Sequence, residues 1–267
     1  MKRIDPQPDW PKSWQESSFY DQSEIYGNIS HHGYAYAYEN RHRETLRLLT
    51  EVLSPGARIL DLAAAQGNFS LALAELGFDV TWNDLRAELE DYVRLKHERG
   101  QIAFAAGNAF ELTFPSLFDA VLITEIIEHV AHPDDFLAKA AALVRPGGYI
   151  VMTTPNGGYF KNRLPKFSEC ADPAVFESIQ FKPNADGHIF LLHSEEITPL
   201  ARSAGLEVEK IVLFTNPLTA GYVKTEPLLK ILPRRIVNFT ESISRHLPWP
   251  LKKKALVQLG VRFRKTD

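Results

Sequence analysis

Two glutamates and a histidine lie close together near the middle of the chain, in the segment TEIIEHV (124–130). Three roles fit this group: a divalent-metal site, a wall of a cofactor pocket, or the acidic start of a solvated helix. If the segment is helical, Glu125, Glu128 and His129 project to one side. They would offer an oxygen-rich half-site for Mg²⁺, with a nitrogen that also suits Mn²⁺ or Zn²⁺. A fourth ligand could come from ADGHIFLLH (185–193).

The elements that must position these residues alternate between strand and helix patterns. Apolar runs predict strands at 57–62, 78–84, 101–108, 118–124, 149–154 and 206–214. Helical periods predict helices at 41–53, 69–77, 85–100, 133–144 and 194–205, the last with Ser194 as its N-cap. Such alternation is typical of an α/β fold with a mostly parallel sheet and helices on both faces. Alternating apolar residues in 255–267 predict a seventh, half-buried, antiparallel strand that closes the sheet.

Three further parts surround or interrupt this core. Residues 1–45 are expected to form an N-terminal arm or lid that is irregular over 1–40, and 46–216 the core, with an insertion at 155–193. Residues 217–254 are expected to form a basic helical insertion before the final strand at 255–267. The arm and the first insertion should build the pocket for a small-molecule acceptor, and five aromatic residues are candidates to stack on it: Tyr34, Tyr36, Phe160, Phe167 and Phe176.

Composition limits the kinds of partner and the compartment. The chain has 267 residues, a net charge of −3 and a single cysteine, Cys170, which fits a reducing compartment. Nucleic acid is therefore not expected as the main partner. The sequence starts without a signal-peptide pattern and has no apolar run of about 20 residues, so we expect a cytoplasmic protein. Its oligomeric state is left open, as is a weak contact of 217–254 with a membrane surface.

The loops after the predicted strands indicate a nucleoside site. The loop AAAQGN (63–68) lacks the G-x-G-x-x-G pattern of dinucleotide folds, which favours a ligand without phosphates over a nicotinamide cofactor. Asp84, at the end of the second strand, could accept hydrogen bonds from ribose hydroxyls. Asn108 and the backbone N–H of Ala109, after the third strand, could bind adenine.

Residues 58–214 resemble the class I S-adenosylmethionine-dependent methyltransferases. The motifs that carry the resemblance are ILDLAAAQGNFS, VTWNDL, AGNAF, FDAVLITEIIEHV, LVRPGGYIVMTTPN and GHIFLLHSEEI. The resemblance implies a Rossmann-like seven-stranded sheet and an S-adenosylmethionine site that includes Asp61, Ala63, Ala65, Gly67, Asn68, Phe69, Asp84, Leu85, Asn108, Ala109, Thr124 and Glu125. Ala63 and Ala65 replace glycines that are usual in this family, and their methyl groups could restrict φ or crowd the cofactor.

The E-x-x-E-H pattern is similar to that of ubiquinone-biosynthesis O-methyltransferases, which act on catechol-type rings, and of small-RNA 2′-O-methyltransferases. This resemblance implies a divalent metal, such as Mg²⁺, held by Glu125, Glu128, His129 and His188, with the first three also catalytic. The expected activity is O-methylation of a small-molecule hydroxyl. Two alternatives stay open: a metal-free methyltransferase for a sugar or polysaccharide precursor, with His129 as general base, and a catalytically dead cofactor-binding module.

Overall fold

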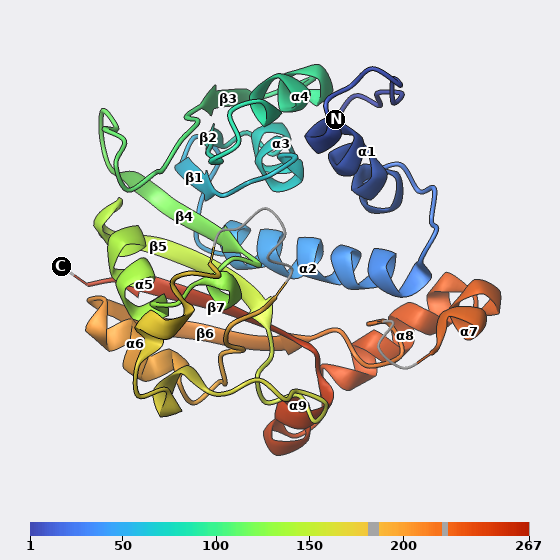
Figure 1. Cartoon of the computed structure of the whole chain (residues 1–267). Helices are drawn as coiled ribbons and strands as arrows, with labels where there is room; N and C mark the ends of the chain where they lie inside the picture. Colours follow the sequence, from blue (N-terminus) through green and yellow to red (C-terminus); the bar gives the residue numbers. More distant parts are fainter. Residues whose placement is uncertain (181–186, 221–223, 267) are drawn as a thin grey trace.

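The computed structural model describes residues 1–180, 187–220 and 224–266. Within these ranges one sheet has the strand order β3-β2-β1-β4-β5-β7-β6 (Figure 1). Its strands are β1 (Arg58–Leu62), β2 (Asp79–Trp82), β3 (Gln101–Phe104), β4 (Phe118–Thr124), β5 (Val144–Pro155), β6 (Leu206–Phe214) and β7 (Gln258–Lys265). The pairs from β3 to β5 are parallel, and β7 is antiparallel to both of its neighbours. The α/β fold, the mostly parallel sheet and the antiparallel last strand are therefore confirmed.

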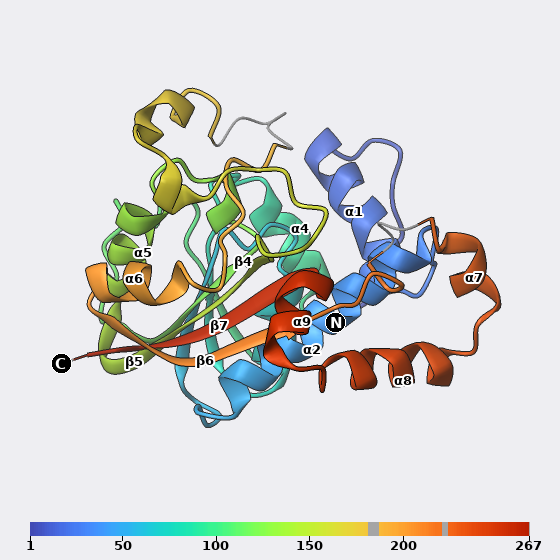
Figure 2. The ribbon, with the colours of Figure 1, turned by 90° about the horizontal axis from the view of Figure 1, so that it is seen from below.

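Helices cover both faces of this sheet (Figure 2). They are α1 (Lys12–Glu24), α2 (His32–Thr50), α3 (Asn68–Glu75), α4 (Leu89–Lys96), α5 (Pro133–Ala142), α6 (Ile197–Ser203), α7 (Glu226–Ile231), α8 (Arg234–Ser244) and α9 (Trp249–Ala255), with 3₁₀ turns η1 (Ile127–His129), η2 (Phe167–Glu169) and η3 (Pro173–Phe176). One core joins α2 and α3 to a face of the central strands, and a second joins α5 and α6 to the opposite face. Because both faces are covered, the central strands read as continuous apolar runs.

The final strand differs from the prediction in its place and its burial. It lies between β5 and β6, and all of its residues from Gln258 to Phe263 are buried. The alternating polar positions suggested a half-buried strand, but Gly260 packs against Val212, Leu48 and Phe214, where a methyl group would clash. Arg262 is buried and pairs with Glu209 and Glu51. The sequence shows an arginine at this alternating position, but it does not show whether the arginine faces solvent or is buried with acidic partners. The prediction of a half-buried strand was wrong for this reason.

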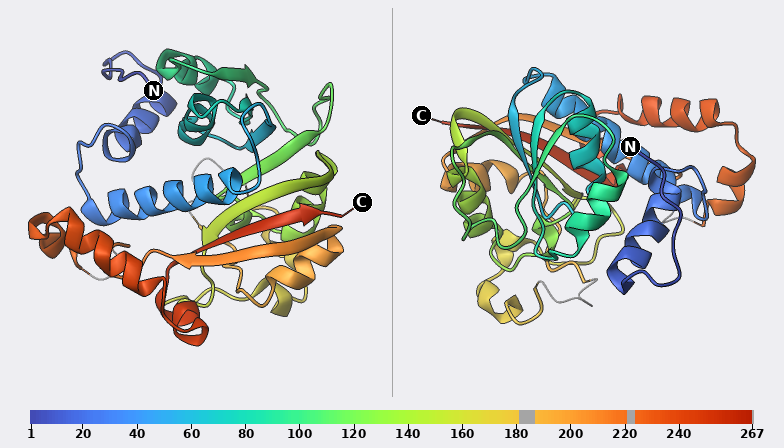
Figure 3. Two further views of the ribbon diagram at one scale, coloured as in Figure 1. Left: turned by 180° about the vertical axis from the view of Figure 1, so that it is seen from behind. Right: turned by 90° about the horizontal axis from the view of Figure 1, so that it is seen from above.

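The N-terminal arm is helical, contrary to the expected irregular structure. Helix α1 buries Ser17, Ser18 and Asp21, so it packs through polar residues and shows no apolar period in the sequence. Helix α2 begins at His32 and includes the aromatic stretch that was expected to form a lid. It runs along the sheet without a break at the expected boundary after residue 45 (Figure 3).

Two smaller expectations concern the insertions. Residues 217–254 contain α7, α8 and most of α9, as the expected helical insertion requires, and 221–223 lie outside the described residues. The insertion at 155–193 contains only short 3₁₀ turns, and 181–186, which include part of the ADGHIFLLH segment, are outside the described residues too. The N-cap of α6 is Glu196, and not Ser194 as predicted. The Glu196 carboxylate accepts hydrogen bonds from the backbone N–H groups of His193 and Ser168. None of the described helices is long and apolar enough to cross a bilayer.

Candidate active site

The carboxyl ends of β1, β2 and β4 form the edge where a ligand is expected, because the strand order reverses on either side of β1. The loop between β1 and α3 lies at this edge. Ala63 and Ala65 have φ values of 53° and 47°, and Gly67 has a φ of 72°. The left-handed backbone that glycines usually provide is thus kept by two alanines, at a cost of about 1–2 kcal/mol each. A methyl group at Gly67 would lie 2.8 Å from the Val93 side chain, so only a glycine fits there.

Asp84 connects this loop to the end of β2. One of its carboxylate oxygens accepts a hydrogen bond from the Ala65 N–H at 2.8 Å. The other accepts from the backbone N–H of Arg86 at 2.9 Å and from the Arg86 guanidinium at 3.0 Å. Asp84 is buried, while its neighbour Leu85 is exposed. A ribose at Asp84, which stays a prediction, would meet the carboxylate and Arg86 together.

Asp61, at the end of β1, lies beneath the same loop. It is fully buried and accepts a hydrogen bond from the Ser70 hydroxyl at 2.5 Å. Burial raises the pKa of its carboxyl to about 7. Its second oxygen has no hydrogen-bond partner among the described residues. Asp61 is therefore placed to hold the loop from below.

The Asn68 side chain points to the N-terminal helix. Its amide donates to Asp21 at 2.8 Å and to Glu24 at 2.7 Å, and its oxygen accepts from Lys96 at 2.7 Å. Lys96 and Asp21 form a fully buried ion pair at 2.7 Å. Sequence reasoning missed this network, which fixes α1 over the start of α3 and leaves the Asn68 side chain no free amide group for a cofactor.

The other predicted cofactor contacts occupy separate places around the edge. Phe69 is buried beside Tyr38 and His42. Asn108 accepts from the Phe110 N–H and donates to Glu111, which is local turn bonding, and Ala109 is buried. Their roles in binding S-adenosylmethionine stay predictions.

Glu125, the first residue after β4, does not join Glu128 and His129. It has a φ of 54°, and its carboxylate lies 3.1 Å from the Arg41 guanidinium on α2. The segment forms a single 3₁₀ turn instead of the helix on which a shared face depended. Glu125 therefore points to α2, although one of its oxygens is buried without a hydrogen-bond partner among the described residues.

Glu128, His129 and His188 do come together. One ligand atom from each lies within 4.8 Å of the others, and the His129 and His188 rings meet edge to face at 5.0 Å. The Thr154 hydroxyl donates to one Glu128 oxygen at 3.0 Å, and the second oxygen is buried without a described partner. The backbone N–H of Ile189 donates to the Glu128 carbonyl at 2.7 Å, which holds the His188 segment in place.

Burial sets the protonation of this cluster. It raises the pKa of Glu128 well above its ordinary value, and the charge of Glu125 adds to the shift. Burial and the neighbouring His129 lower the pKa of His188, so its imidazole is neutral near pH 7. A carboxylate with a raised pKa is a stronger base once it has lost its proton, so ionised Glu128 beside the neutral imidazole of His188 is suited to take up a proton.

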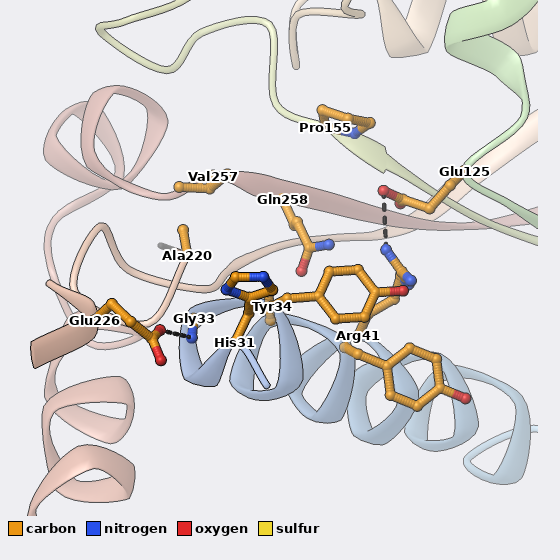
Figure 4. A pocket seen from close by; sticks show the side chains of 12 residues that line it. His31, Gly33, Tyr34, Arg41, Glu125, Pro155, Ala220, Glu226, Val257 and Gln258 are labelled. Atoms are coloured by element: carbon orange, nitrogen blue, oxygen red, sulfur yellow. Dashed lines mark hydrogen bonds and ion pairs between the residues drawn. The ribbon is translucent and has the colours of Figure 1, made fainter. Parts of the chain in front are cut away.

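A cavity of about 380 Å³ opens between α2 and the ends of β5 and β7. Figure 4 shows Glu125, Arg41, Tyr34 and Gln258 around it, with the Glu125–Arg41 ion pair along one side. The other lining residues are His31, Gly33, Ala37, Tyr38, Pro155, Ala220, Glu226 and Val257. Arg41 and Gln258 were missed because each lies in a segment that reads as ordinary helix or strand.

Only one of the five candidate aromatic residues lines this cavity, namely Tyr34. Tyr36 packs with Leu229 of α7 and Val237 of α8. Phe167 and Phe176 pack edge to face on Phe190, and Phe160 is 56% exposed. Most of these rings therefore pack the insertions themselves.

A methyltransferase-domain family model matches residues 31–211, from the start of α2 into β6. The chain belongs to this family. The matched range contains the loop of Ala63, the acid at Asp84 and the cluster of Glu128, His129 and His188, whereas one side of the cavity, with Gln258, comes from residues beyond it.

Two named relatives are ubiquinone biosynthesis O-methyltransferases. That of Xanthomonas campestris is 37% identical over 109 residues, which cover 39% of this chain and 46% of the relative. That of Thiobacillus denitrificans is 29% identical over 173 residues, 62% of this chain and 72% of the relative. The chain thus spans about half the length of the Xanthomonas protein.

The N-methyltransferase NodS from Bradyrhizobium japonicum, solved in complex with S-adenosyl-L-homocysteine, shares the fold. Its TM-score is 0.55 with 13% identity, over 96% of this chain and all of the NodS chain. The fold of class I S-adenosylmethionine-dependent methyltransferases is therefore established.

Proposed function

We propose that this methyltransferase transfers the methyl group of S-adenosylmethionine to a hydroxyl oxygen of a small molecule. The observation that carries the proposal is the cluster of buried Glu128 and half-buried His129 and His188 after the carboxyl end of β4. The two relatives named above are O-methyltransferases by name, which supports oxygen as the acceptor atom.

Methyl transfer needs a nucleophilic oxygen in line with the sulfonium. The oxygen forms a bond to the methyl carbon, the carbon–sulfur bond breaks, and its electron pair returns to sulfur to leave a neutral thioether. The hydroxyl proton must go to a base, and Glu128 and His129 are the groups in place to accept it. Much of the remaining acceleration would come from holding the oxygen and the carbon about 3–3.5 Å apart.

The same cluster fits a divalent cation. The orphaned oxygen of Glu128 and the neutral imidazole of His188 are the donors that such an ion needs. Because Glu125 pairs with Arg41, the donor set is one carboxylate and two imidazoles, which suits Zn²⁺ or Mn²⁺ better than Mg²⁺. When bound there, the cation would supply Lewis-acid polarisation of the acceptor oxygen.

The Arg41–Glu125 pair supports the cavity beside it as the acceptor site. The pair places a guanidinium and a carboxylate, each with one unpartnered buried atom, on the cavity wall. The rest of the wall is largely apolar, with Pro155, Val257 and Tyr38. A hydroxylated ring with an apolar body matches this lining.

A screen with methyl-labelled S-adenosylmethionine tests the proposal. Catechol-type, phenolic and sugar acceptors are incubated with the wild type and with Glu128→Gln, with and without a divalent ion. We expect label on a ring hydroxyl with the wild type and a loss with Glu128→Gln. Labelled sugar and no effect of a chelator would favour the metal-free version with His129 as base. Binding of S-adenosylmethionine without transfer to any acceptor class would indicate a binding module.

A further inference from the structure

The insertion between β6 and β7 concentrates positive charge. Residues 224–255 hold eight lysines and arginines and two glutamates, a formal charge of +6 in a chain whose net charge is −3. Both glutamates are used internally: Glu226 bonds to His32 and Gly33, and Glu241 is buried against Asn216 and Thr219. The outer surface of the described part of this insertion is therefore basic.

Helix α8 has two opposite faces. Its inner face carries Val237, Glu241 and Ser244, which are buried. Two ion pairs fix this helix to α2, Arg234 to Glu39 at 2.8 Å and Arg245 to Glu44 at 2.6 Å. The outer face carries Ile236, Phe239 and Ile243, which are 47%, 64% and 51% exposed. Their spacing of three and four residues makes one apolar stripe, and Arg235 lies next to it on the helix.

The neighbouring helices extend this exposed apolar surface. Ile231 and Leu228 of α7 are exposed, as are Trp249 and Leu251 of α9. The three lysines at 252–254 follow directly, and they form no ion pair with a carboxylate in the described ranges. Trp and Lys beside exposed aliphatic residues are the composition of helices that lie in a membrane interface.

The insertion also leaves and rejoins the core at the cavity. Ala220 near its beginning, Glu226 at the start of α7 and Val257 just before β7 all line the cavity. Figures 1 and 3 show α7 and α8 on the same side of the molecule, next to the start of α2. A surface bound to these helices would therefore lie close to the cavity residues.

We propose that α7–α9 form a docking surface for an anionic lipid bilayer. The surface needs a partner that is both negatively charged and apolar. A second copy of this chain has a net negative charge but would also need a matching apolar face. An anionic bilayer offers negative headgroups and, beneath them, an apolar interior. The apolar stripe inserts at the headgroup level, and Arg235 with the lysines of α9 binds the lipid phosphates. This surface serves an acceptor that resides in the bilayer, and docking itself does not depend on methyl transfer.

Vesicle co-sedimentation tests the proposal. The full chain is mixed with phosphatidylcholine vesicles that do or do not contain phosphatidylglycerol. We expect binding to the anionic vesicles that is at least about tenfold tighter than to the neutral ones and that weakens with salt. Ile236→Ser/Phe239→Ser/Ile243→Ser should lower the anionic partition coefficient by about tenfold or more, because the apolar stripe is lost. Lys252→Gln/Lys253→Gln/Lys254→Gln should lower it by a similar factor and reduce the salt dependence, because fewer cations then face the lipid.

A matched control removes exposed apolar side chains elsewhere. Leu76→Ser/Leu95→Ser/Val175→Ser changes residues that are 46%, 45% and 64% exposed outside the insertion, and it should bind vesicles like the wild type. Circular dichroism and thermal melts establish that each variant is folded. Equal binding of all variants, or no binding to anionic vesicles, would overturn the proposal. So would a dimer in sedimentation velocity that the stripe variant converts to a monomer, because the face would then be a contact between copies.

Discussion

The Glu125 carboxylate lies 3.1 Å from the Arg41 guanidinium, while Glu128, three residues later, accepts a hydrogen bond from Thr154 and lies beside two imidazoles. One short motif thus serves two neighbouring places. Glu125 belongs to the wall of the cavity, and buried Glu128 belongs to the cluster with His129 and His188. The positive φ of Glu125 and the single 3₁₀ turn that follows produce this division.

Glu128→Gln and His129→Ala should each lower kcat by about 10²–10⁴-fold, because each removes a group that can accept the hydroxyl proton. Affinity for S-adenosylmethionine, measured by calorimetry, should change little. Glu111→Gln is the control, since that carboxylate bonds only to the local turn residue Asn108. If activity survives in both cluster variants, the base lies elsewhere.

Removal of divalent ions tests the metal within the same cluster. We expect a chelator to abolish activity, and Zn²⁺ or Mn²⁺ to restore it at lower concentration than Mg²⁺. His188→Ala should weaken binding of Zn²⁺ by about 10–100-fold in direct titration, a readout independent of turnover. His246→Ala is the control, because that histidine is exposed on the basic insertion. Full activity in the chelator would leave His129 as a metal-free general base.

Ala63→Gly and Ala65→Gly should each raise the free energy of unfolding by about 0.5–1 kcal/mol. Glycine relieves the left-handed strain at φ values of 53° and 47°, and this gain exceeds its entropy cost in the unfolded chain. Ala64→Gly, between them and without a positive φ, should lower stability by about the same amount. Urea unfolding of the three variants checks this, and the reverse order would show that the loop is not strained.

The pKa of Asp61, raised by burial to about 7, makes stability depend on pH. The folded chain keeps a proton there that the unfolded chain loses near pH 4, so wild-type stability falls as the pH rises from about 4 to about 7. Asp61→Asn lacks this loss. Its stability relative to the wild type should therefore rise by on the order of 3 kcal/mol across that range and level off above it.

Asp119→Asn provides the comparison for Asp61. Burial tends to raise the pKa of Asp119, but hydrogen bonds from Arg58 and Arg145 outweigh this effect. The pKa of Asp119 is therefore lowered below its ordinary value. It should show no such trend between about pH 5 and pH 8. Urea titrations at several pH values, without cofactor, measure both variants. A flat profile for the difference between the wild type and Asp61→Asn would contradict the raised pKa.

Local patterns were sufficient for the sheet. The apolar run of β4 and the nine residues of β6 have the predicted bounds, because burial on both faces leaves a clear signal. The polar helix α1 could not be predicted, because it packs through polar residues instead of an apolar face. Its buried Asp21 pairs with Lys96, which lies 75 residues away in the sequence. Arg262 in β7 is a similar case, because its acidic partners come from α2 and β6.

The candidate site could be predicted where sequence motifs supply its residues. The motif of Glu125 to His129 and the distant His188 were found, and three of the four proposed ligands meet. Glu125 pairs with Arg41 because of its positive φ and because of the way α2 packs on the sheet. The spacing of residues in the sequence reveals neither of these. Gln258 reaches the cavity only because β7 lies between β5 and β6.

Calorimetric titration with S-adenosyl-L-homocysteine tests the central claim most directly, namely that the loop of Ala63–Gly67 and Asp84 form a nucleoside site. We predict one binding site per chain, with affinity lowered about tenfold or more in Asp84→Asn and unchanged in Asp79→Asn, which alters a more exposed acid at the other end of the same strand. Thermal melts establish that both variants are folded. No heat of binding for the wild type, or equal affinity in all three proteins, would contradict the account.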